Sequence, residues 1–276
     1  MHSLTTTMQA LLQLPRLAYA LTYALYVALL FLALGLTATL IGVVLPGVQR
    51  RRAVARAMAR AFLFLAGMHV KVIAPERLPA GQCVVVSNHA SYLDGIVFTA
   101  ALPARFGFVI KREMATVPLA GFMLRRLGSQ FVERFDPRRG AADARRVLRK
   151  AISGHSLVFF PEGTFTRSPG LLRFHTGAFA TAVRARCPLV PAVIRGSREA
   201  LSPSGGLPHP HRIEVEFLPA LQLGSRTGAD PAVELRDRAR AEILRNLGEP
   251  DLTYFGGNAE NPTQPIDSAA KSRNAV

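Results

Sequence analysis

The chain has 276 residues, contains no tryptophan and only two cysteines, and has 18 acidic residues against 34 basic ones. Cys83 and Cys187 lie in apolar runs outside any CxxC pair, which argues against a disulfide framework or a cysteine-based zinc site. Without tryptophan, one platform for base stacking is missing, and no zinc-finger spacing or basic/aromatic RNA-binding motif occurs. A nucleic-acid binder is therefore disfavoured, although the net charge is +16.

The motifs of several common enzyme classes are also absent. A serine esterase needs a GxSxG turn, whereas residues 195–199 read RGSRE and lack the first and last glycines. His209 and His211 flank a proline without an accompanying acidic cluster, which argues against a metal hydrolase. Neither a Walker loop nor a dinucleotide-binding glycine motif occurs.

Charge is absent from one long N-terminal segment, because no charged residue occurs between Arg16 and Arg50. A membrane-spanning helix needs about 20 apolar residues, and the apolar region of a signal peptide has only about 7–15. The segment therefore predicts a retained membrane anchor, which either crosses with a tilt or breaks near Gly35 into two interfacial helices. A long buried core helix is the alternative.

Basic residues follow this segment. Only Arg16 precedes it, and the five arginines behind it predict that the chain after the anchor faces the cytoplasm, at a bacterial inner membrane: Arg50, Arg51, Arg52, Arg56 and Arg60. Residues 48–64 alternate arginines with apolar residues at helical period. This predicts a basic amphipathic helix that either lies along lipid headgroups or packs on the neighbouring domain. Residues 1–66 are assigned to the anchor and this helix.

Alternating strand and helix patterns predict one catalytic domain over residues 67–250. Short apolar runs predict strands at 69–74, 83–87, 106–110, 130–132, 156–160, 189–194 and 213–218. Helices are predicted at 92–102, 118–127, 141–152, 174–185 and 230–247, the last with Asp230 as its N-cap. The pattern favours an α/β fold with a mainly parallel central sheet flanked by helices. Pro191 predicts an edge or end position for its strand, and the polar residues 251–276 predict a disordered tail.

A histidine stands five residues before an aspartate in the segment Asn88-His89-Ala90-Ser91-Tyr92-Leu93-Asp94. A neutral imidazole can take a proton from an alcohol while a carboxylate orients its other nitrogen. The segment directly follows a predicted strand, and in open α/β sheets ligands bind at that edge. His89 and Asp94 are therefore candidates for a general base and its orienting partner.

A second polar segment, FPEGTFTRS at residues 160–168, follows another apolar strand. Gly163 lets backbone amides approach an anion, and Thr164 can donate a hydrogen bond. Arg167 carries a charge suited to phosphate. Glu162 could orient an acceptor hydroxyl or pair with an arginine.

The order of four short blocks carries a family resemblance. NHxxxxD at 88–94 is followed by GxxFxxR at 128–134, by FPEGT at 160–164 and by an apolar VPxxI segment at 190–194. This order resembles the glycerolipid acyltransferase family, whose bacterial members of this size resemble 1-acylglycerol-3-phosphate acyltransferases. The resemblance covers residues 84–195 and implies the fold of glycerol-3-phosphate acyltransferases.

The resemblance also implies roles for individual residues. It implies that His89 is the general base and that Asp94 orients it. It places at the acceptor-phosphate site Arg134, Glu162, Gly163 and Thr164. Lys111 belongs to a segment that is similar to the lysine-containing segment of the family. Arg167 stands two places later than the family's usual arginine, so a different headgroup remains open.

The implied reaction transfers a fatty acyl group to the free hydroxyl of a lyso-glycerophospholipid. Acyl-CoA or acyl-carrier protein is the donor, and no metal or bound cofactor is needed. Lysophosphatidate is the first choice of acceptor, and another lyso-lipid such as lyso-ornithine lipid is the alternative. A nonenzymatic, membrane-tethered lipid-binding module would also explain the anchor and the charge, but it gives His89 and Asp94 no role.

Overall fold

A computed structural model describes residues 2–133, 136–222 and 230–253. Its centre is a seven-stranded sheet with the strand order β1-β7-β6-β2-β5-β3-β4. The strands are β1 (His69–Ile73), β2 (Val84–Ser87), β3 (Phe106–Lys111), β4 (Gln130–Val132), β5 (Ser156–Phe159), β6 (Leu189–Arg195) and β7 (Arg212–Phe217). Every neighbouring pair is parallel except β6 and β7. The predicted α/β fold with a mainly parallel sheet is confirmed.

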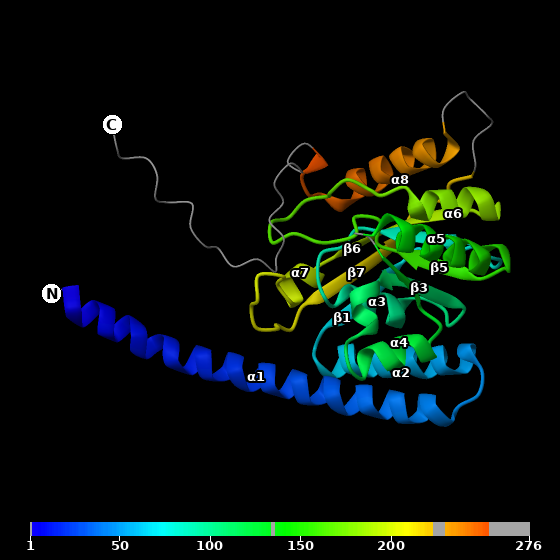
Figure 1. Cartoon of the computed structure of the whole chain (residues 1–276). Helices are drawn as coiled ribbons and strands as arrows, with labels where there is room; N and C mark the ends of the chain where they lie inside the picture. Colours follow the sequence, from blue (N-terminus) through cyan, green and yellow to red (C-terminus); the bar gives the residue numbers. More distant parts are fainter. Residues whose placement is uncertain (1, 134–135, 223–229, 254–276) are drawn as a thin grey trace, which may run out of the picture.

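Helices cover both faces of the sheet (Figure 1). One face is covered by α5 (Pro137–Ile152), α6 (Gly177–Ala185) and α8 (Pro231–Leu247). The other carries α2 (Val48–Leu65) and α3 (Asp94–Ala101), with α4 (Ala120–Arg126) and the N-terminal helix α1 (His2–Val44) beyond them. The short elements are η1 (Pro75–Arg77), η2 (Arg112–Ala115) and α7 (Ser197–Ala200).

The two helix layers enclose two hydrophobic cores. Successive side chains of a strand point to opposite faces, and β2 is buried on both. Val85 packs in the core that contains Phe98 of α3, whereas Val84 and Val86 pack in the core that contains Phe179 of α6. This explains why β2 is a continuous apolar run, as expected for a buried parallel strand.

Local signals set several element boundaries. The Asp230 carboxylate accepts a hydrogen bond from the Ala232 N–H (2.9 Å), which confirms it as the N-cap of α8. Strand β7 alternates buried and more accessible residues, the pattern of a strand with one face toward the core. Asp251 forms a β-bridge with Leu171 and an ion pair with Arg240 (2.6 Å), so the domain continues to this residue. The rest of the predicted tail, from residue 254, lies outside the described residues.

The expectation that Pro191 marks an edge or end position for its strand is wrong, because β6 lies inside the sheet, between β7 and β2. The Pro191 carbonyl accepts from the Leu218 N–H (2.8 Å), so this residue turns its backbone polar groups toward β7. The antiparallel register begins one residue later, at Ala192 opposite Phe217. Pro191, which has no N–H, therefore lies one residue outside the antiparallel pairing of β6 with β7. Its pairing with Val86 of β2 is unaffected.

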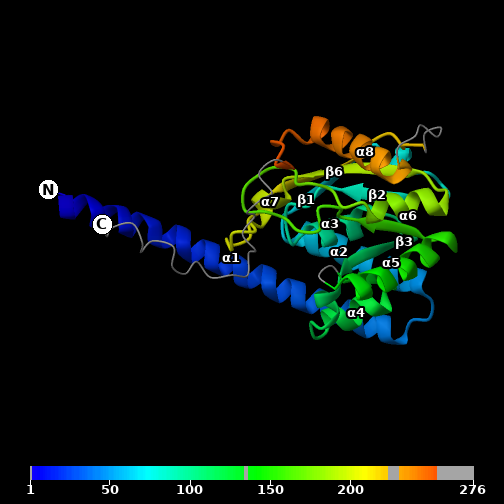
Figure 2. The same ribbon diagram turned by 45° about the horizontal axis from the view of Figure 1, so that its top comes forward.

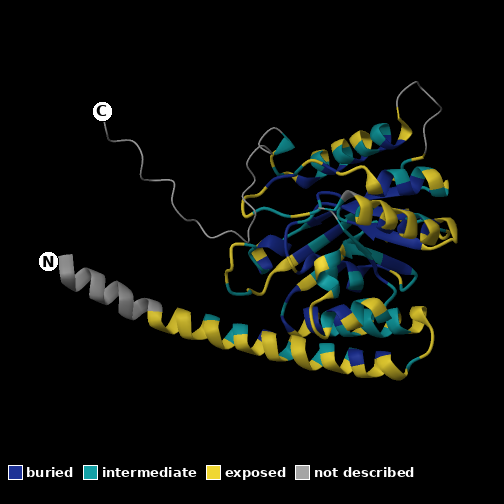
Figure 3. Ribbon diagram, in the orientation of Figure 1, coloured by how far each residue is buried: buried dark blue, intermediate teal, exposed yellow. Residues whose placement is uncertain are grey.

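The N-terminal segment forms one helix without a break at Gly35. Its apolar part is Leu14–Val44, and the most apolar 18-residue window in it has a mean hydropathy of 2.5 and is 17% buried. It is long and apolar enough to cross a membrane, by length and composition only, at roughly 46 Å against a hydrocarbon layer of about 30 Å. Its N-terminal part extends beyond the domain (Figure 2), and most of its described surface is exposed (Figure 3).

The C-terminal half of α1 packs on the domain. Val27 is buried, and the Tyr23 hydroxyl donates to the Ala66 carbonyl (2.6 Å) just after α2. Between Leu14 and Val44, the opposite side of the helix exposes large apolar residues, among them Leu25, Leu29, Leu32, Leu36 and Leu40. An apolar face of this extent is suited to contact with lipid.

Helix α2 packs on the domain, which was one of its two predicted environments. Arg52 donates to the carbonyls of Leu127 (2.8 Å) and Arg105 (2.9 Å), and Arg60 donates to the Ala100 carbonyl (2.9 Å). Phe62 and Leu63 are buried in the core beside α3. These arginines were candidates for contact with lipid headgroups. In the structure they instead donate hydrogen bonds to backbone carbonyls at or near the ends of other elements.

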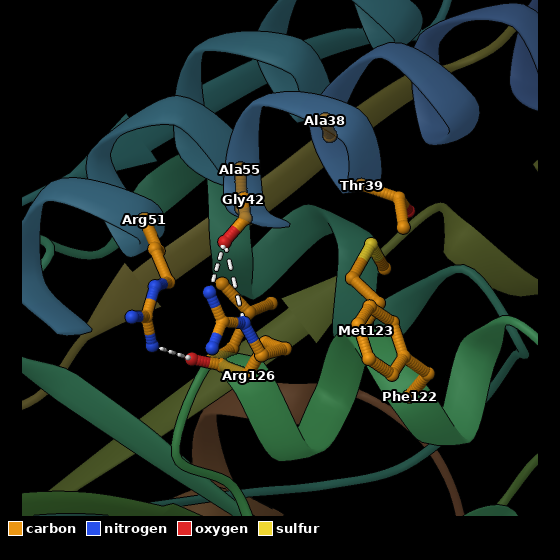
Figure 4. A pocket seen from close by; sticks show the side chains of 9 residues that line it. Ala38, Thr39, Gly42, Arg51, Ala55, Phe122, Met123 and Arg126 are labelled. Carbon is orange, nitrogen blue, oxygen red and sulfur yellow. Dashed lines mark hydrogen bonds between the residues drawn. The ribbon is translucent and has the colours of Figure 1, made fainter. Parts of the chain in front are cut away.

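A small cavity marks the meeting of α1, α2 and α4, with Thr39, Phe122 and Met123 in its wall (Figure 4). Beside it, the Arg126 guanidinium donates to the carbonyls of Gly42 (2.8 Å) and Val43 (2.7 Å) at the C-terminus of α1. These carbonyls have no partner within the helix, so Arg126 both satisfies them and fastens α1 to the domain.

Candidate active site

The candidate site lies where the parallel strands β2, β5 and β3 end side by side. The carboxyl ends of parallel strands meet at one edge of a sheet. His89 follows β2, Glu162 follows β5, and Lys111 ends β3. The fold thus brings to one edge residues that are widely separated in the sequence.

His89 and Asp94 form a hydrogen-bonded pair, with 2.7 Å between Nδ1 of the imidazole and Oδ2 of the carboxylate. The same oxygen accepts the backbone N–H groups of Ala90 (2.6 Å) and Ser91 (2.9 Å), and Asp94 is fully buried. A carboxylate acceptor at Nδ1 places the proton of the neutral imidazole on that nitrogen. Nε2 is then the nitrogen that can take a proton.

Asn88 holds the turn that carries His89. Its side-chain oxygen accepts from the Ile194 N–H (2.9 Å), and its amide donates to the Ile194 carbonyl (3.0 Å). The two bonds join the end of β2 to the neighbouring strand β6. No role was predicted for Asn88, although its place directly after a buried strand was a usable signal.

Aromatic rings enclose the imidazole. Phe160 stacks on His89 with ring centroids 4.4 Å apart, and Phe165 meets it edge-on at 4.5 Å. Tyr92 in turn meets Phe165 edge-on at 4.8 Å. These contacts fix the plane of the imidazole ring and reduce its exposure to water. They were not predicted, although Phe160 and Phe165 directly flank the PEGT segment.

Glu162 lies behind His89 and is 4% exposed. Its two carboxylate oxygens accept the backbone N–H groups of His89 (2.6 Å) and Leu172 (2.8 Å). Burial raises the pKa of Glu162 to about 8, against the lowering effect of these two hydrogen bonds. Because the carboxylate faces the protein interior, its placement favours a role in positioning His89 rather than contact with a phosphate.

The pKa of Glu162 leads to a testable dependence of stability on pH. An unfolded glutamate titrates near 4.3, so between about pH 5 and 8 the folded state keeps a proton that the unfolded state has lost. Stability must fall as pH rises through this window. As pH rises through this window, we expect the melting temperature of the wild type to fall by several degrees relative to that of Glu162→Gln. This corresponds to a loss of a few kcal/mol in the free energy of unfolding.

Thermal melts of both proteins from pH 4.5 to 8.5 provide the measurement. Gln leaves one of the two backbone N–H groups without an acceptor, which shifts its curve by an amount that does not depend on pH. Only the difference in slope reports the carboxyl group. Parallel curves would contradict the raised pKa.

The other predicted binding residues lie around this pair. Gly163 adopts a φ of +77°, and its N–H closes a turn onto the Phe160 carbonyl (3.0 Å). Thr164, Arg167 and Lys111 are exposed at the same edge. Arg134 lies outside the described residues. The roles of all five in binding substrate stay predictions.

A buried arginine holds the loop that follows the PEGT segment. Arg198 of α7 donates to the carbonyls of Thr166 (2.6 Å) and Arg167 (3.3 Å). It also lies 3.7 Å from the carboxylate of Glu249, which itself accepts the Gly170 N–H (2.6 Å). These contacts set the position of the loop that places Phe165 against His89. Nothing in the sequence pattern indicated this role for Arg198.

Within the described ranges, no group of three or more His, Cys, Asp or Glu side chains could hold a metal ion. The geometry offers a buried carboxylate, an imidazole with one free nitrogen, and a partly enclosed surface beside it. This arrangement can remove a proton from a hydroxyl group.

Comparison with known proteins decides the family. Residues 69–195 match the family described as Acyltransferase. The mouse 1-acyl-sn-glycerol-3-phosphate acyltransferase alpha is 30% identical over 197 residues, which cover 70% of this chain and 69% of the mouse protein. The chain belongs to the acyltransferase family. The predicted family, and with it an enzyme that transfers acyl groups, is confirmed.

The chain covers different shares of other members of the acyltransferase family. It spans 38% of a Brassica napus chloroplast 1-acyl-sn-glycerol-3-phosphate acyltransferase, at 33% identity and over 47% of its own length. A lyso-ornithine lipid O-acyltransferase from Rhodobacter capsulatus is 41% identical over 96 residues, which cover 35% of this chain and 34% of that protein.

The fold of this acyltransferase matches a crystal structure. That structure is the 1-acyl-sn-glycerophosphate acyltransferase PlsC from Thermotoga maritima, with a TM-score of 0.68 and 20% sequence identity. The match covers 85% of this chain and 95% of the Thermotoga chain. It supports the mainly parallel sheet with flanking helices as the shared architecture.

Proposed function

We propose that the protein transfers a fatty acyl group from acyl-CoA or acyl-carrier protein to the free hydroxyl of 1-acylglycerol-3-phosphate, which gives phosphatidic acid. The observation that carries the proposal is the buried Asp94 carboxylate bonded to Nδ1 of His89. The names of the mouse and Brassica napus relatives support this acceptor.

In the first step, Nε2 of His89 takes the proton of the acceptor hydroxyl. The oxygen attacks the thioester carbonyl carbon, and the C=O electron pair moves to its oxygen. The new positive charge on the imidazole lies beside the Asp94 carboxylate, which stabilises it. A serine nucleophile is not needed, because the thioester already activates the acyl group.

In the second step, the tetrahedral intermediate collapses and its C–S bond breaks. The departing thiolate takes the proton from Nε2, which returns His89 to its neutral state. The products are the free thiol and the new ester, so atoms and charges balance. The two proposed steps require no bound cofactor or metal.

Recognition of the acceptor is assigned to the binding residues that the sequence predicts. Lys111, Arg134 and Arg167 supply positive charge for the phosphate, and the Gly163-Thr164 turn supplies hydrogen-bond donors. The edge of the sheet places Lys111 two strands away from β2, which corresponds to roughly 10 Å. The free hydroxyl and the phosphate of the acceptor stand on adjacent glycerol carbons, so the side chains of His89 and Lys111 would have to reach toward each other to span the rest of this separation.

A second acceptor has specific support. The Rhodobacter capsulatus relative named for lyso-ornithine lipid reaches the highest of the identities given above, over a short region. Arg167 also stands two places later than in the usual pattern of the family. Both features favour lyso-ornithine lipid as the competing acceptor.

A panel of lyso-lipids tests the assignment. Purified full-length protein is supplied with one acyl-CoA and with lysophosphatidate, lyso-ornithine lipid or lysophosphatidylcholine, and products are identified by mass. The proposal predicts phosphatidate as the main product. Acylation of lyso-ornithine lipid alone would assign the second acceptor, and lipid binding without any product would favour a nonenzymatic module.

The protein is further proposed to act at the bacterial inner membrane, with its catalytic domain on the cytoplasmic face. The exposed leucine face of α1 supports attachment to lipid. The arginines that follow α1 support a cytoplasmic domain, because basic residues favour that side.

Cysteine labelling tests this orientation. Cys83 and Cys187 are buried, and burial raises the pKa of Cys83 to about 11, so the wild type should react poorly with a membrane-impermeant maleimide. A cysteine introduced at the exposed residue Ser153 should be labelled in inverted membrane vesicles and protected in right-side-out ones. The opposite labelling pattern would place the domain on the outer face.

A further inference from the structure

One buried carboxylate joins the ends of two strands beside the candidate site. Asp143 of α5 is 2% exposed. Its oxygens accept from Nη2 of Arg112 at 2.6 and 2.5 Å and from Nε of Arg112 at 3.2 Å. Arg112 directly follows the last residue of β3, so this contact holds the end of that strand.

The same carboxylate holds the end of β4. Oδ2 of Asp143 accepts the backbone N–H of Glu133 (3.0 Å), the residue that follows β4. Arg146, one turn along α5, donates to Oδ1 of Asp143 (2.8 Å) and to the Phe131 carbonyl within β4 (2.8 Å). α5 is thereby bound to both strand ends at the edge where the acceptor is proposed to bind.

The positive side chains at this edge differ in whether they form ion pairs. Arg112 and Arg146 both pair with Asp143. Burial alone would raise the pKa of the Asp143 carboxyl, but its bonds to Arg112 and to the Glu133 N–H outweigh burial and lower this pKa, so the carboxyl remains ionised. Lys111 is exposed and immediately precedes Arg112. Lys111 forms no ion pair with any residue that the structure describes, so it is available to an anionic ligand. The contact of Arg112 with Asp143 fixes the backbone from which the Lys111 side chain extends, and a group on a fixed backbone loses less entropy when it binds.

We infer that Asp143 is a positioning residue, which acts through Arg112 to present Lys111 to the anionic group of the acceptor. This inference rests on the proposed function. It concerns the binding of the acceptor and not the proton transfer, because His89 and Asp94 are placed by β2 and α3 and, among the described residues, form no hydrogen bond or ion pair with Asp143.

Steady-state kinetics with lysophosphatidate and a saturating acyl donor tests the inference. Asp143→Asn and Arg112→Met should each raise KM for the acceptor about tenfold and change kcat less than about threefold, because a loss of uniform binding appears in KM alone. The double variant should be no worse than Asp143→Asn, since both substitutions break the same contact. Arg112 is partly exposed, so Arg112→Met keeps the test valid even if Asp143→Asn does not fold.

Arg146→Met is the matched control. It removes the same charge and another partner of Asp143 but leaves the Arg112 contact, so its KM should change less than about threefold. An equal rise in KM for Arg146→Met would indicate a general effect of charge and overturn the inference. Unchanged KM values in Asp143→Asn and Arg112→Met, with only kcat or the melting temperature lowered, would overturn it as well. Wild-type protein that does not turn over lysophosphatidate would instead refute the proposed function.

Discussion

Replacing His89 by alanine is expected to reduce the rate of acyl transfer by about 10³-fold, because a positioned general base contributes roughly 10²–10⁴-fold and His89 is the imidazole that is paired with the buried Asp94. The acceptor hydroxyl would then have to lose its proton to water. Binding of lipid should be retained, since the exposed face of α1 is untouched.

The variant should remain folded. The imidazole is partly exposed, and its removal leaves a gap between Phe160 and Phe165 at the surface of the domain. A change of this kind costs about 0.5–3 kcal/mol. His89→Gln serves as a second variant, because its side chain can fill more of the gap and still donate to Asp94, but it cannot accept the proton.

His155→Ala is the control for the loss of a histidine. His155 is exposed and precedes β5, so it lies at the opposite edge of the sheet from His89. Product formation should be unchanged in this control and lost in both His89 variants, as measured by mass under identical lipid and donor concentrations. Activity of His89→Ala within tenfold of the wild type would exclude His89 as the base.

Substituting Asp94 by asparagine is expected to lower kcat by between about 10²- and 10⁴-fold, with little change in KM for either substrate. The carboxylate stabilises the positive charge that forms on His89 while the hydroxyl proton is transferred. A neutral amide at the same place keeps a hydrogen bond but loses this charge. The transition state therefore loses more stabilisation than the bound substrates do.

The surroundings of Asp94 predict how the asparagine would sit. Two backbone N–H groups, from Ala90 and Ser91, point at Oδ2, so the amide oxygen should occupy that position and its NH₂ the position of Oδ1. Oδ1 is buried and has no hydrogen-bond partner within the described part of the chain. The geometry of the turn should thus be preserved, so that the loss of rate reports mainly the loss of charge.

A comparison of melting curves with kinetics separates charge from structure. Asp94→Asn should melt within a few degrees of the wild type, whereas Asp94→Ala also loses the acceptor for two backbone N–H groups and should melt lower. If Asp94→Asn retained its kcat, the carboxylate would only orient the ring. If KM rose while kcat stayed constant, Asp94 would belong to substrate binding instead.

The order of strands and helices could be predicted from residue patterns, because burial imposes a period on each element. Apolar runs located all seven strands, and Asp230 located the start of α8. The exception was Pro191. Because Pro191 has no N–H, its strand was expected at the edge of the sheet. The pairing of β6 with β7 begins one residue later, at Ala192, and this register depends on a strand that is distant in the sequence.

For the site, the sequence predicted the pair His89 and Asp94, because their spacing spans a single strand-to-helix turn. It did not predict the direction of Glu162, which was assigned to the acceptor but faces the backbone of His89. Nor did it predict Asn88 or Arg198, whose partners lie on β6 and in the loop after β5. Contacts between distant segments leave no spacing pattern that a single sequence can show.

The sequence by itself determined the family and the fold class and pointed to the pair of His89 and Asp94, since local periodicity and short motifs are properties of neighbouring residues. Only the tertiary structure decided that α1 continues past Gly35, that the arginines of α2 serve the domain, and that Asp143 joins two strand ends. Each of these depends on which side chains and carbonyl groups burial brings together, and this is set by the packing of the whole chain.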